Sequence, residues 1–262
     1  MQCDQAQQET LVRFLERDAV YHTFILSDML HYGFQAPFQQ IYMQTSPGGD
    51  CTGVFLRYYH NLILAGEAPG AEFPALWALV GGQVSTVMGK AALVQGLQEA
   101  CDLKPWSLAV KDLYALPGGE HLLPPLPAAE EADLENVDAI HDFLMQVPQF
   151  RALYGEKAMI ENRIRQGDGR HLTLTQNGQI AAHANSAAGT ELACMVGGVA
   201  VAEALRGRGL GHQIVSELCR RLRLGGQTPC LFSDYPPSRS LFCDLGFEKV
   251  GTWGVLEQSK RV

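Results

Sequence analysis

Residues 206 to 211 read Arg-Gly-Arg-Gly-Leu-Gly, and they lie between an apolar run that ends at Val201 and an amphipathic run that begins at Leu210. A strand that leads through glycines into a helix directs unpaired backbone N–H groups and the positive end of the helix dipole to one point. A pyrophosphate fits such a point, and glycines let the main chain approach it without an intervening Cβ. We call residues 206 to 211 the glycine-rich turn and predict that it binds a pyrophosphate.

The run after the glycine-rich turn has the pattern of an amphipathic helix. Apolar residues recur every four positions, which places them on one helical face. They are Leu210, Ile214, Leu218 and Leu222. Arginines crowd the last turn and Gly225-Gly226 follows, as expected at a helix C-terminus. The sequence therefore predicts a helix from about residue 210 to the glycine pair.

Two common phosphate-binding loops do not fit this turn. A P-loop requires a lysine and a hydroxyl residue after its last glycine, and neither is present. A dinucleotide-binding fingerprint requires Gly-x-Gly-x-x-Gly in a parallel unit, whereas the spacing here is Gly-x-Gly-x-Gly and the preceding strands are expected to be antiparallel. Arg206, Gly209 and Gly211 instead form an Arg-x-x-Gly-x-Gly pattern. It resembles motif A of the GCN5-related N-acetyltransferases (GNAT superfamily), which hold the pyrophosphate of acetyl-coenzyme A.

The segments around the turn follow the order of that superfamily. Asn177-Gly178 predicts a hairpin, and residues 191 to 201 then form an apolar strand that leads into the turn. After the helix come a predicted strand, a further helix and Leu245-Gly246-Phe247, which matches the superfamily's Leu-Gly-Phe. The resemblance covers roughly residues 130 to 260. It implies an α+β fold with a mainly antiparallel twisted sheet flanked by helices.

A stretch rich in proline and glycine divides the chain into two predicted domains. Residues 117–130 break every periodic pattern, which is typical of a linker. We therefore expect an N-terminal α+β domain at residues 1–116 and a GNAT domain at residues 131–262. The N-terminal half loosely repeats the element order, so it is either a degenerate GNAT-like domain or an unrelated α+β accessory domain. Two carboxylates at residues 66–72, where its own glycine-rich turn should fall, would repel a pyrophosphate.

Composition narrows the partners of the chain. The 262 residues are 47% hydrophobic, and a net charge of −8 argues against a nucleic-acid surface, which needs basic clusters. The seven cysteines follow no disulfide or metal-ligand spacing, and no signal or membrane-spanning segment is apparent. We therefore expect a cytoplasmic monomer or homodimer that binds no metal, membrane or nucleic acid.

The resemblance implies which residues hold acetyl-coenzyme A. In the superfamily the strand before the turn separates from its neighbour, and its unpaired backbone groups hold the pantetheine arm and the acetyl carbonyl. By position these groups belong to Val199, Ala200 and Val201. Gly197-Gly198 would ease the bulge that such a separation needs. The expected pyrophosphate contacts are Arg206, Gly207, Arg208, Gly209, Leu210, Gly211 and His212.

Acetyl transfer also needs a base for the amine and a proton for the departing thiolate. Glu191, at the start of the strand, is the preferred candidate base, with His183 and Glu203 as alternatives. A solvated, idle carboxylate is the other interpretation of Glu191. The superfamily's usual acid is a tyrosine four residues before the glycine of Leu-Gly-Phe, and here that position is Phe242. Tyr235 is the remaining candidate acid, although a thiol leaves tolerably without help.

The predicted function is therefore an N-acetyltransferase that moves the acetyl group of acetyl-CoA to a primary amine by direct attack. Tyr154, Arg151 and Glu156 are the polar residues of the expected acceptor side, and they name no particular small molecule or peptide. Two alternatives remain open. A non-catalytic acyl-CoA-binding or regulatory module is favoured by Phe242, and a structural interaction protein would use its glycines for packing only.

Overall fold

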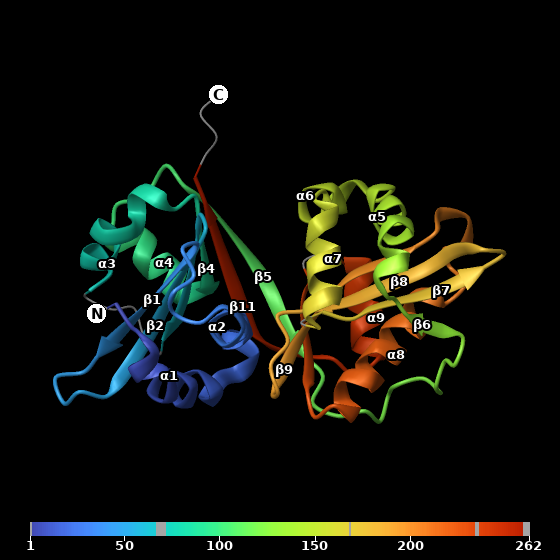
Figure 1. The fold of residues 1–262 in the computed structure, drawn as a ribbon, viewed down its shortest axis with the longest axis horizontal. Coiled ribbons are helices and arrows are strands. Elements are labelled where there is room, and N and C mark those ends of the chain that lie inside the picture. Colours follow the sequence, from blue (N-terminus) through green and yellow to red (C-terminus); the bar gives the residue numbers. More distant parts are fainter. Residues whose placement is uncertain (1, 67–71, 168, 234–235, 259–262) are drawn as a thin grey trace. The chain divides into compact units, whose positions relative to one another are not determined.

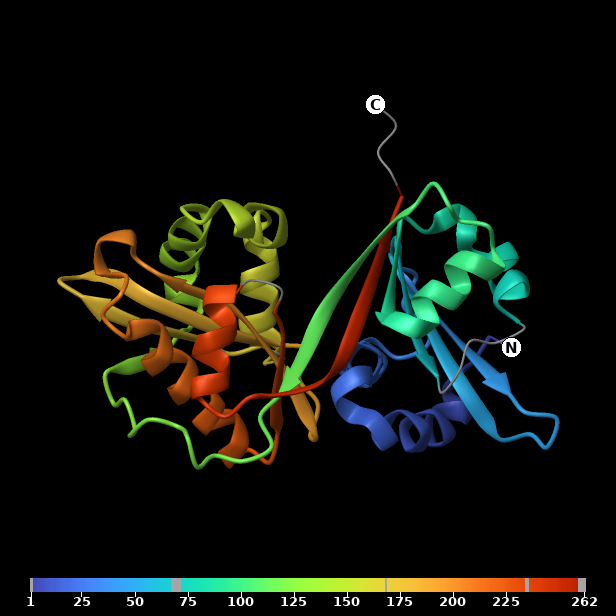
Figure 2. The same cartoon turned by 180° about the vertical axis from the view of Figure 1, so that it is seen from behind.

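The computed structural model describes residues 2–66, 72–167, 169–233 and 236–258. These residues form two compact units, each built of helices packed on strands (Figure 1), and Figure 2 shows the reverse side. Unit 1 contains the residues up to Leu113 and those from Val250 onward, and unit 2 contains Tyr114–Lys249. The segment from Val250 onward is thus part of unit 1, which differs from the predicted C-terminal domain at residues 131–262.

Unit 1 is a mixed sheet with helices packed on it. Its helices are α1 (Gln8–Leu15), α2 (Ala19–Tyr32), α3 (Phe73–Val80) and α4 (Ala91–Ala100). Its strands are β1 (Gln39–Thr45), β2 (Cys51–Tyr58), β3 (Asn61–Gly66), β4 (Thr86–Lys90), most of β5 (Ser107–Ala115) and most of β11 (Glu248–Glu257). The strand order is β1-β2-β3-β4-β11-β5, in which β3 and β4 are parallel. Pairs β1–β2, β2–β3 and β4–β11 are antiparallel.

Unit 2 has a sheet of similar design. Its helices are α5 (Val137–Met145), α6 (Arg151–Tyr154), α7 (Lys157–Gln166), α8 (Leu210–Leu224) and α9 (Pro236–Asp244). Its strands are β6 (Ala129–Glu131), β7 (His171–Gln176), β8 (Gln179–Ala187), β9 (Ala193–Val201) and β10 (Thr228–Ser233). They lie in the order β10-β9-β8-β7-β6, and only the β9–β10 pair among them is parallel.

The two units have the same order of elements along the chain. Each has helices, then three successive antiparallel strands, a helix, a strand parallel to the third and a further helix. The strand that follows the first series is β5 and the one that follows the second is β11, most of which belongs to unit 1, and unit 2 has the additional strand β6 before its helices. The predicted α+β class with a mainly antiparallel sheet is confirmed. The repeated order supports a GNAT-like N-terminal half over an unrelated accessory domain. The carboxylates considered there lie at residues 67 and 72, and residues 67–71 are outside the described part of the chain.

The apolar stripe of α8 decides how unit 2 packs. Ile214, Leu218 and Leu222 are buried against the sheet, in one cluster with Leu172 and Phe247. The predicted helix is therefore confirmed, with its end at Leu224 just before the glycine pair. None of the described helices is long and apolar enough to cross a membrane.

The proline-rich segment before β6 is packed against α8 and is not a free linker. The N–H of Leu123 donates to Ser216 Oγ (2.8 Å), and the N–H of Leu126 donates to Glu217 Oε2 (3.1 Å). Arg221 Nη2 donates to Ala129 O (2.7 Å) and pairs through Nε with Glu217 Oε1 (2.9 Å). Burial alone would raise the pKa of Glu217. The hydrogen bonds from Leu126 and Arg221 and the charges of Arg221 and Arg220 together have the larger effect, so the net shift of this pKa is downward. We call this segment, residues 117–128, the strap of unit 2. Side chains of α8 supply the hydrogen-bond partners for its backbone that neighbouring residues in the sequence do not supply.

Candidate functional site

The glycine-rich turn needs its glycines for two different reasons. Gly207 (φ +76°) and Gly209 (φ +79°) have left-handed backbone conformations, although a Cβ at either position would meet no atom within 4 Å. Gly211 is limited by space instead. Its Cβ would lie 3.2 Å from Leu241 Cδ1 and 3.6 Å from Val201 Cγ2. Gly211 therefore lets the start of α8 lie close to Val201 at the end of β9 and to Leu241 of α9.

The backbone N–H groups of this turn are not used by the protein itself. In the described structure, no backbone or side-chain acceptor receives a hydrogen bond from the N–H groups of Gly207 through His212. The first amide bonded at this end is that of Gln213, which donates to Gly209 O (3.1 Å). Gly207, Arg208 and Gly209 are exposed. Free donors at the N-terminus of a fifteen-residue helix favour an anion.

The two arginines of the turn and the neighbouring His212 have different surroundings. Arg206 Nε donates to Val201 O (3.3 Å) and Arg208 Nη2 donates to Ala204 O (3.4 Å), and both side chains are exposed. Neither forms an ion pair with a carboxylate in the described ranges, so both remain available to an anion. His212 was expected beside a phosphate, but its Nε2 lies 3.3 Å from Asp244 Oδ2. That contact favours His212 as a partner of α9.

Strand β9 separates from β10 just before the turn. Thr228, Pro229 and Cys230 of β10 pair with Ala193, Cys194 and Met195 of β9. Beyond Met195 no described residue of β10 pairs with β9, which continues to Val201. This is the separation that the resemblance implied. It leaves one edge of the second half of β9 open.

The open edge presents the backbone groups of alternate residues. On the other edge Ala200 is opposite His183, and the N–H of Ala202 donates to Ala181 O (2.9 Å). Antiparallel pairing alternates, so Ala200 directs its N–H and C=O toward β8, whereas Val199 and Val201 direct theirs away from it. The hydrogen bond from Arg206 to Val201 O agrees with this direction. Among the three predicted residues, Val199 and Val201 fit a ligand at the open edge and Ala200 does not.

A bulge in the β8–β9 pair turns the chain at Gly197 and Gly198. The register shifts between His183 and Asn185, and Gly198 has φ +57°. A Cβ at Gly198 would lie 1.9 Å from Asn185 Oδ1. Glycine is therefore required both by backbone conformation and by space, which agrees with the predicted easing of a bulge.

Two separate pairs of buried, hydrogen-bonded side chains lie at the bulge. His183 Nδ1 donates to Gly198 O (2.7 Å), and because a carbonyl only accepts, Nδ1 carries the proton and Nε2 accepts. His171 Nδ1 donates to His183 Nε2 (3.0 Å). Tyr154 Oη donates to Asn185 Oδ1 (2.8 Å). Burial lowers the pKa of His183 to about 4, and burial and the neighbouring His183 lower that of His171 to about 3. Both imidazoles are therefore neutral at pH 7.

The described residues that were predicted as catalytic candidates do not lie at the open edge of β9. His183 has 0% exposure and both of its nitrogens are bonded, so it cannot be a base that touches substrate. Glu191 is exposed in the bend before β9, eight positions from Val199, which is roughly 25 Å along an extended chain. Phe242 is buried against Phe247 with ring centroids 5.7 Å apart. Tyr235 lies outside the described residues.

Other predicted residues have roles that the sequence did not indicate. Tyr154, expected on the acceptor side, is buried behind the bulge, while Glu203 is exposed in the short helical turn after β9. His171 and Asn185 belong to the two buried pairs and were not predicted. The Asn177-Gly178 hairpin alone would place His171 opposite Ala184, and only a register shift between Leu174 and Thr175 brings His171 opposite Asn185, so no signal in the sequence indicated these two residues.

The fold of the chain resembles that of solved acetyltransferases of the GNAT superfamily. Residues 172–255 match the family model described as FR47-like protein. A GNAT acetyltransferase from Colwellia psychrerythraea covers 98% of this chain and 98% of its own, with a TM-score of 0.58 and 16% identity. A GCN5-related N-acetyltransferase-like protein from Streptococcus suis covers 96% of this chain and 98% of its own, with a TM-score of 0.57 and 16% identity.

A tandem GNAT protein from the clavulanic acid biosynthesis pathway covers 100% of this chain and 99% of its own, with a TM-score of 0.60 and 14% identity. The likeness therefore extends over both units. No curated protein sequence matches the chain. The predicted resemblance to the GNAT superfamily is confirmed at the level of the fold, and the N-terminal half shares in it.

Proposed function

We propose that unit 2 binds an acyl-coenzyme A, with acetyl-CoA as the expected form, and transfers its acyl group to a primary amine. The observation that carries this proposal is the set of free N–H groups from Gly207 to His212, which adjoins the open edge of β9. An anion-binding helix terminus beside an unpaired strand edge suits a ligand with a diphosphate at one end and an amide-containing arm at the other.

Each part of the site has a separate role in this proposal. The N–H groups of the glycine-rich turn bind the pyrophosphate, and Arg206 or Arg208 adds a charge-assisted hydrogen bond. Val199 and Val201 offer backbone donors and acceptors to the amides of the pantetheine arm. A donor on this edge also stabilises the oxyanion that develops on the acyl carbonyl. The bound thioester supplies an activated acyl group for direct attack, so no covalent enzyme intermediate is needed.

The protein's ionisable groups contribute less to this reaction than expected. Glu191 is too far along β9 to contact the amine directly, and we do not assign it as the base. Tyr235 stays the proposed acid for the departing thiolate, on its sequence position alone. The buried His171–His183 pair holds the Gly198 carbonyl and so fixes the bulge from which Val199 follows. Both histidines are positioning residues in this proposal.

A matched pair of substitutions at Gly209 tests the binding step. Asparagine tolerates a left-handed backbone, and a Cβ at Gly209 meets no atom within 4 Å, so Gly209→Asn is expected to fold. Gly209→Asp has the same size but adds a negative charge near the diphosphate. At about 5 Å and an effective dielectric constant between about 20 and 80, one charge pair gives about 1–3 kcal/mol. Calorimetry should show coenzyme A binding about 5- to 150-fold weaker for Asp than for Asn.

Equal affinities of the Asp and Asn variants for coenzyme A would contradict a diphosphate at this turn. The absence of any coenzyme A binding by the unmodified protein would contradict the proposal as a whole. In that case the glycines serve packing, as the structural alternative holds.

A non-catalytic acyl-CoA sensor is the second candidate function, and the buried Phe242 in place of the usual acid favours it. Release of free coenzyme A thiol from acetyl-CoA should be followed with amino acids, polyamines and peptide N-termini as acceptors. Amine-dependent release supports the transferase. Tight binding without release for every amine supports the sensor.

A further inference from the structure

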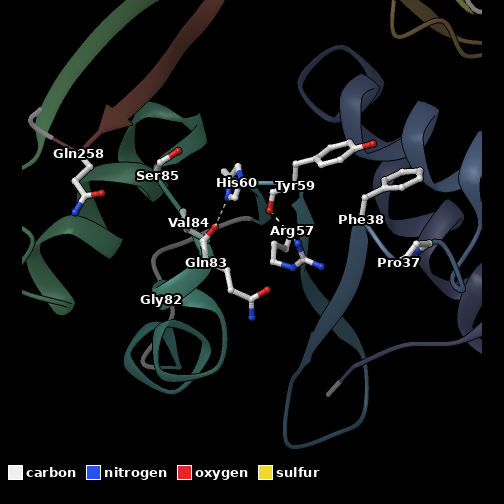
Figure 3. A pocket seen from close by; sticks show the side chains of 10 residues that line it. All are labelled: Pro37, Phe38, Arg57, Tyr59, His60, Gly82, Gln83, Val84, Ser85 and Gln258. Atoms are coloured by element: carbon white, nitrogen blue, oxygen red, sulfur yellow. Dashed lines mark hydrogen bonds between the residues drawn. The ribbon is translucent and has the colours of Figure 1, made fainter.

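Unit 1 contains an open cavity of about 830 Å³ (Figure 3), whereas the glycine-rich turn belongs to unit 2. It is bordered by the end of β2 and by the residues that precede β3 and β4, including His60 and Ser85. Gln258, which follows β11, also lines it. The position that corresponds to the glycine-rich turn follows the opposite end of β3. The cavity is therefore at the other end of these strands, where the proposed function assigns nothing.

A buried guanidinium faces this cavity. Arg57 is only 6% exposed, and in Figure 3 its side chain lies between Gln83 and the rings of Phe38 and Tyr59. Its Nε donates to Gln40 Oε1 (3.0 Å) and its Nη1 donates to Tyr59 O (2.9 Å). A guanidinium has five N–H donors, so the majority have no partner in the described part of the chain.

Arg57 also lacks a counter-charge among the described residues. No carboxylate of the described residues forms an ion pair with it, although buried charges are normally paired. Its Nη2 has no partner among the described residues and is not among the fully enclosed atoms, so it is reachable from the cavity that Arg57 lines. A buried, oriented cation with open donors is best explained by an anion that enters from the cavity.

Two aromatic rings form a wall beside the guanidinium. Phe38 and Tyr59 stack in parallel, with centroids 5.0 Å apart and an interplanar angle of 5°. Tyr59 has φ +50° and remains 51% exposed. Its N–H donates to Phe38 O (2.7 Å), and its carbonyl is held by Arg57. A strained non-glycine residue that keeps a large ring exposed over a cavity is typical of a ligand contact.

The charge of the lining selects the kind of anion. Arg57 is the only lysine or arginine among the described lining residues. The other polar side chains are the two amides of Gln83 and Gln258, the two hydroxyls of Tyr59 and Ser85, and His60, whose Nδ1 is 3.1 Å from Gln83 O. One planar guanidinium matches one carboxylate, whereas a phosphate dianion would keep an uncompensated charge. We propose that this cavity binds a small organic carboxylate, with its acid group on Arg57 and a flat apolar part against Phe38 and Tyr59.

The full chain should be titrated with benzoate, with benzamide as the neutral isostere and inorganic phosphate as the rival anion, and binding followed by ligand-observed NMR. Benzoate is expected to bind at least tenfold more tightly than benzamide and than phosphate. No saturable benzoate binding up to about 10 mM, or equal binding of benzamide, overturns the proposal. Tighter binding of phosphate overturns the choice of a carboxylate.

Two substitutions locate the binding. Arg57→Gln is expected to abolish the preference for benzoate over benzamide. Because a buried position can fail to fold, Tyr59→Gly provides a second variant, in which glycine suits φ +50° and removes one wall of the cavity. It should weaken benzoate at least threefold, while Arg13→Gln, an exposed arginine paired with Glu9 on α1, should leave it unchanged. Unchanged benzoate binding by Tyr59→Gly contradicts this location. Coenzyme A binding by unit 2 is independent of every one of these results.

Discussion

The neutral His171–His183 pair makes the stability of unit 2 depend on pH in a defined direction. In the folded protein the pKa values are about 3 for His171 and about 4 for His183, against 6.5 for an ordinary histidine. Folded pKa values below the unfolded ones mean that the unfolded chain binds more protons between pH 6.5 and about 4. The contribution of the pair is therefore complete above pH 6.5 and is lost as the pH falls through this window.

The size of the effect follows from the same values. For each histidine, the free energy of unfolding falls by about 1.4 kcal/mol for each unit of decreasing pH over which that histidine is protonated in the unfolded chain only. Lowering the pH from 7.5 to 5.0 should thus remove about 2 kcal/mol for each histidine and about 4 kcal/mol for the pair. The physical reason is that His171 Nε2 is buried without a partner among the described residues, and His183 is bonded at both nitrogens. A proton would place an unpaired cation in the core.

Urea unfolding at pH 7.5 and 5.0 measures this loss. Cys194, Cys219 and Cys230 are buried in unit 2, so their reaction with dithiodipyridine reports its unfolding. The three tryptophans all lie in unit 1, and their fluorescence follows that unit separately.

Substitutions at the pair provide the control for other titrating groups. His171→Gln should lose about half of the pH dependence of the unmodified protein, whatever its absolute stability, because it removes one titrating group. His183→Gln should act similarly. If both variants keep the full difference between pH 7.5 and 5.0, the pair is not responsible and the neutral assignment is wrong.

Three further substitutions test how unit 2 is built. Gly198→Ala should lower the unfolding free energy of unit 2 by about 2–4 kcal/mol in thermal melts, because alanine would have to adopt a left-handed backbone and its Cβ would lie 1.9 Å from Asn185 Oδ1. An unaltered melting curve would argue against the bulge. Phe242→Tyr should destabilise the protein by about 1–3 kcal/mol without raising the rate of thiol release, because the hydroxyl enters an apolar cluster; faster release would return this position to the catalytic site. Glu217→Ala should accelerate proteolysis within residues 117–128 and lower stability by about 2 kcal/mol, because it frees the strap and leaves Arg221 with only the more distant carboxylate of Glu131 (3.9 Å) among the described residues. Unchanged cleavage would show that the strap is held elsewhere.

Local patterns in the sequence were sufficient for the core of unit 2. The period of apolar residues in α8, the Asn177-Gly178 hairpin and the three glycines of the turn each depend on neighbours within a few positions. Such features are encoded by backbone preference and helical or strand periodicity. The sequence therefore determined the fold class, and it placed the free amides and the strand edge that the proposed function uses.

The remaining features were decided only by tertiary structure. The strap depends on side chains of α8 about ninety positions away, and the segment from Val250 onward joins unit 1 through β4. Proline and glycine alone indicated a linker, because a local pattern does not show which distant partner satisfies its backbone. The same reason applies to the buried histidine pair, whose neutral state depends on burial. It applies also to Arg57, whose free N–H donors depend on which side chains lie next to it. Burial and charge pairing are properties of neighbours in space, and these neighbours come from segments that no sequence period connects.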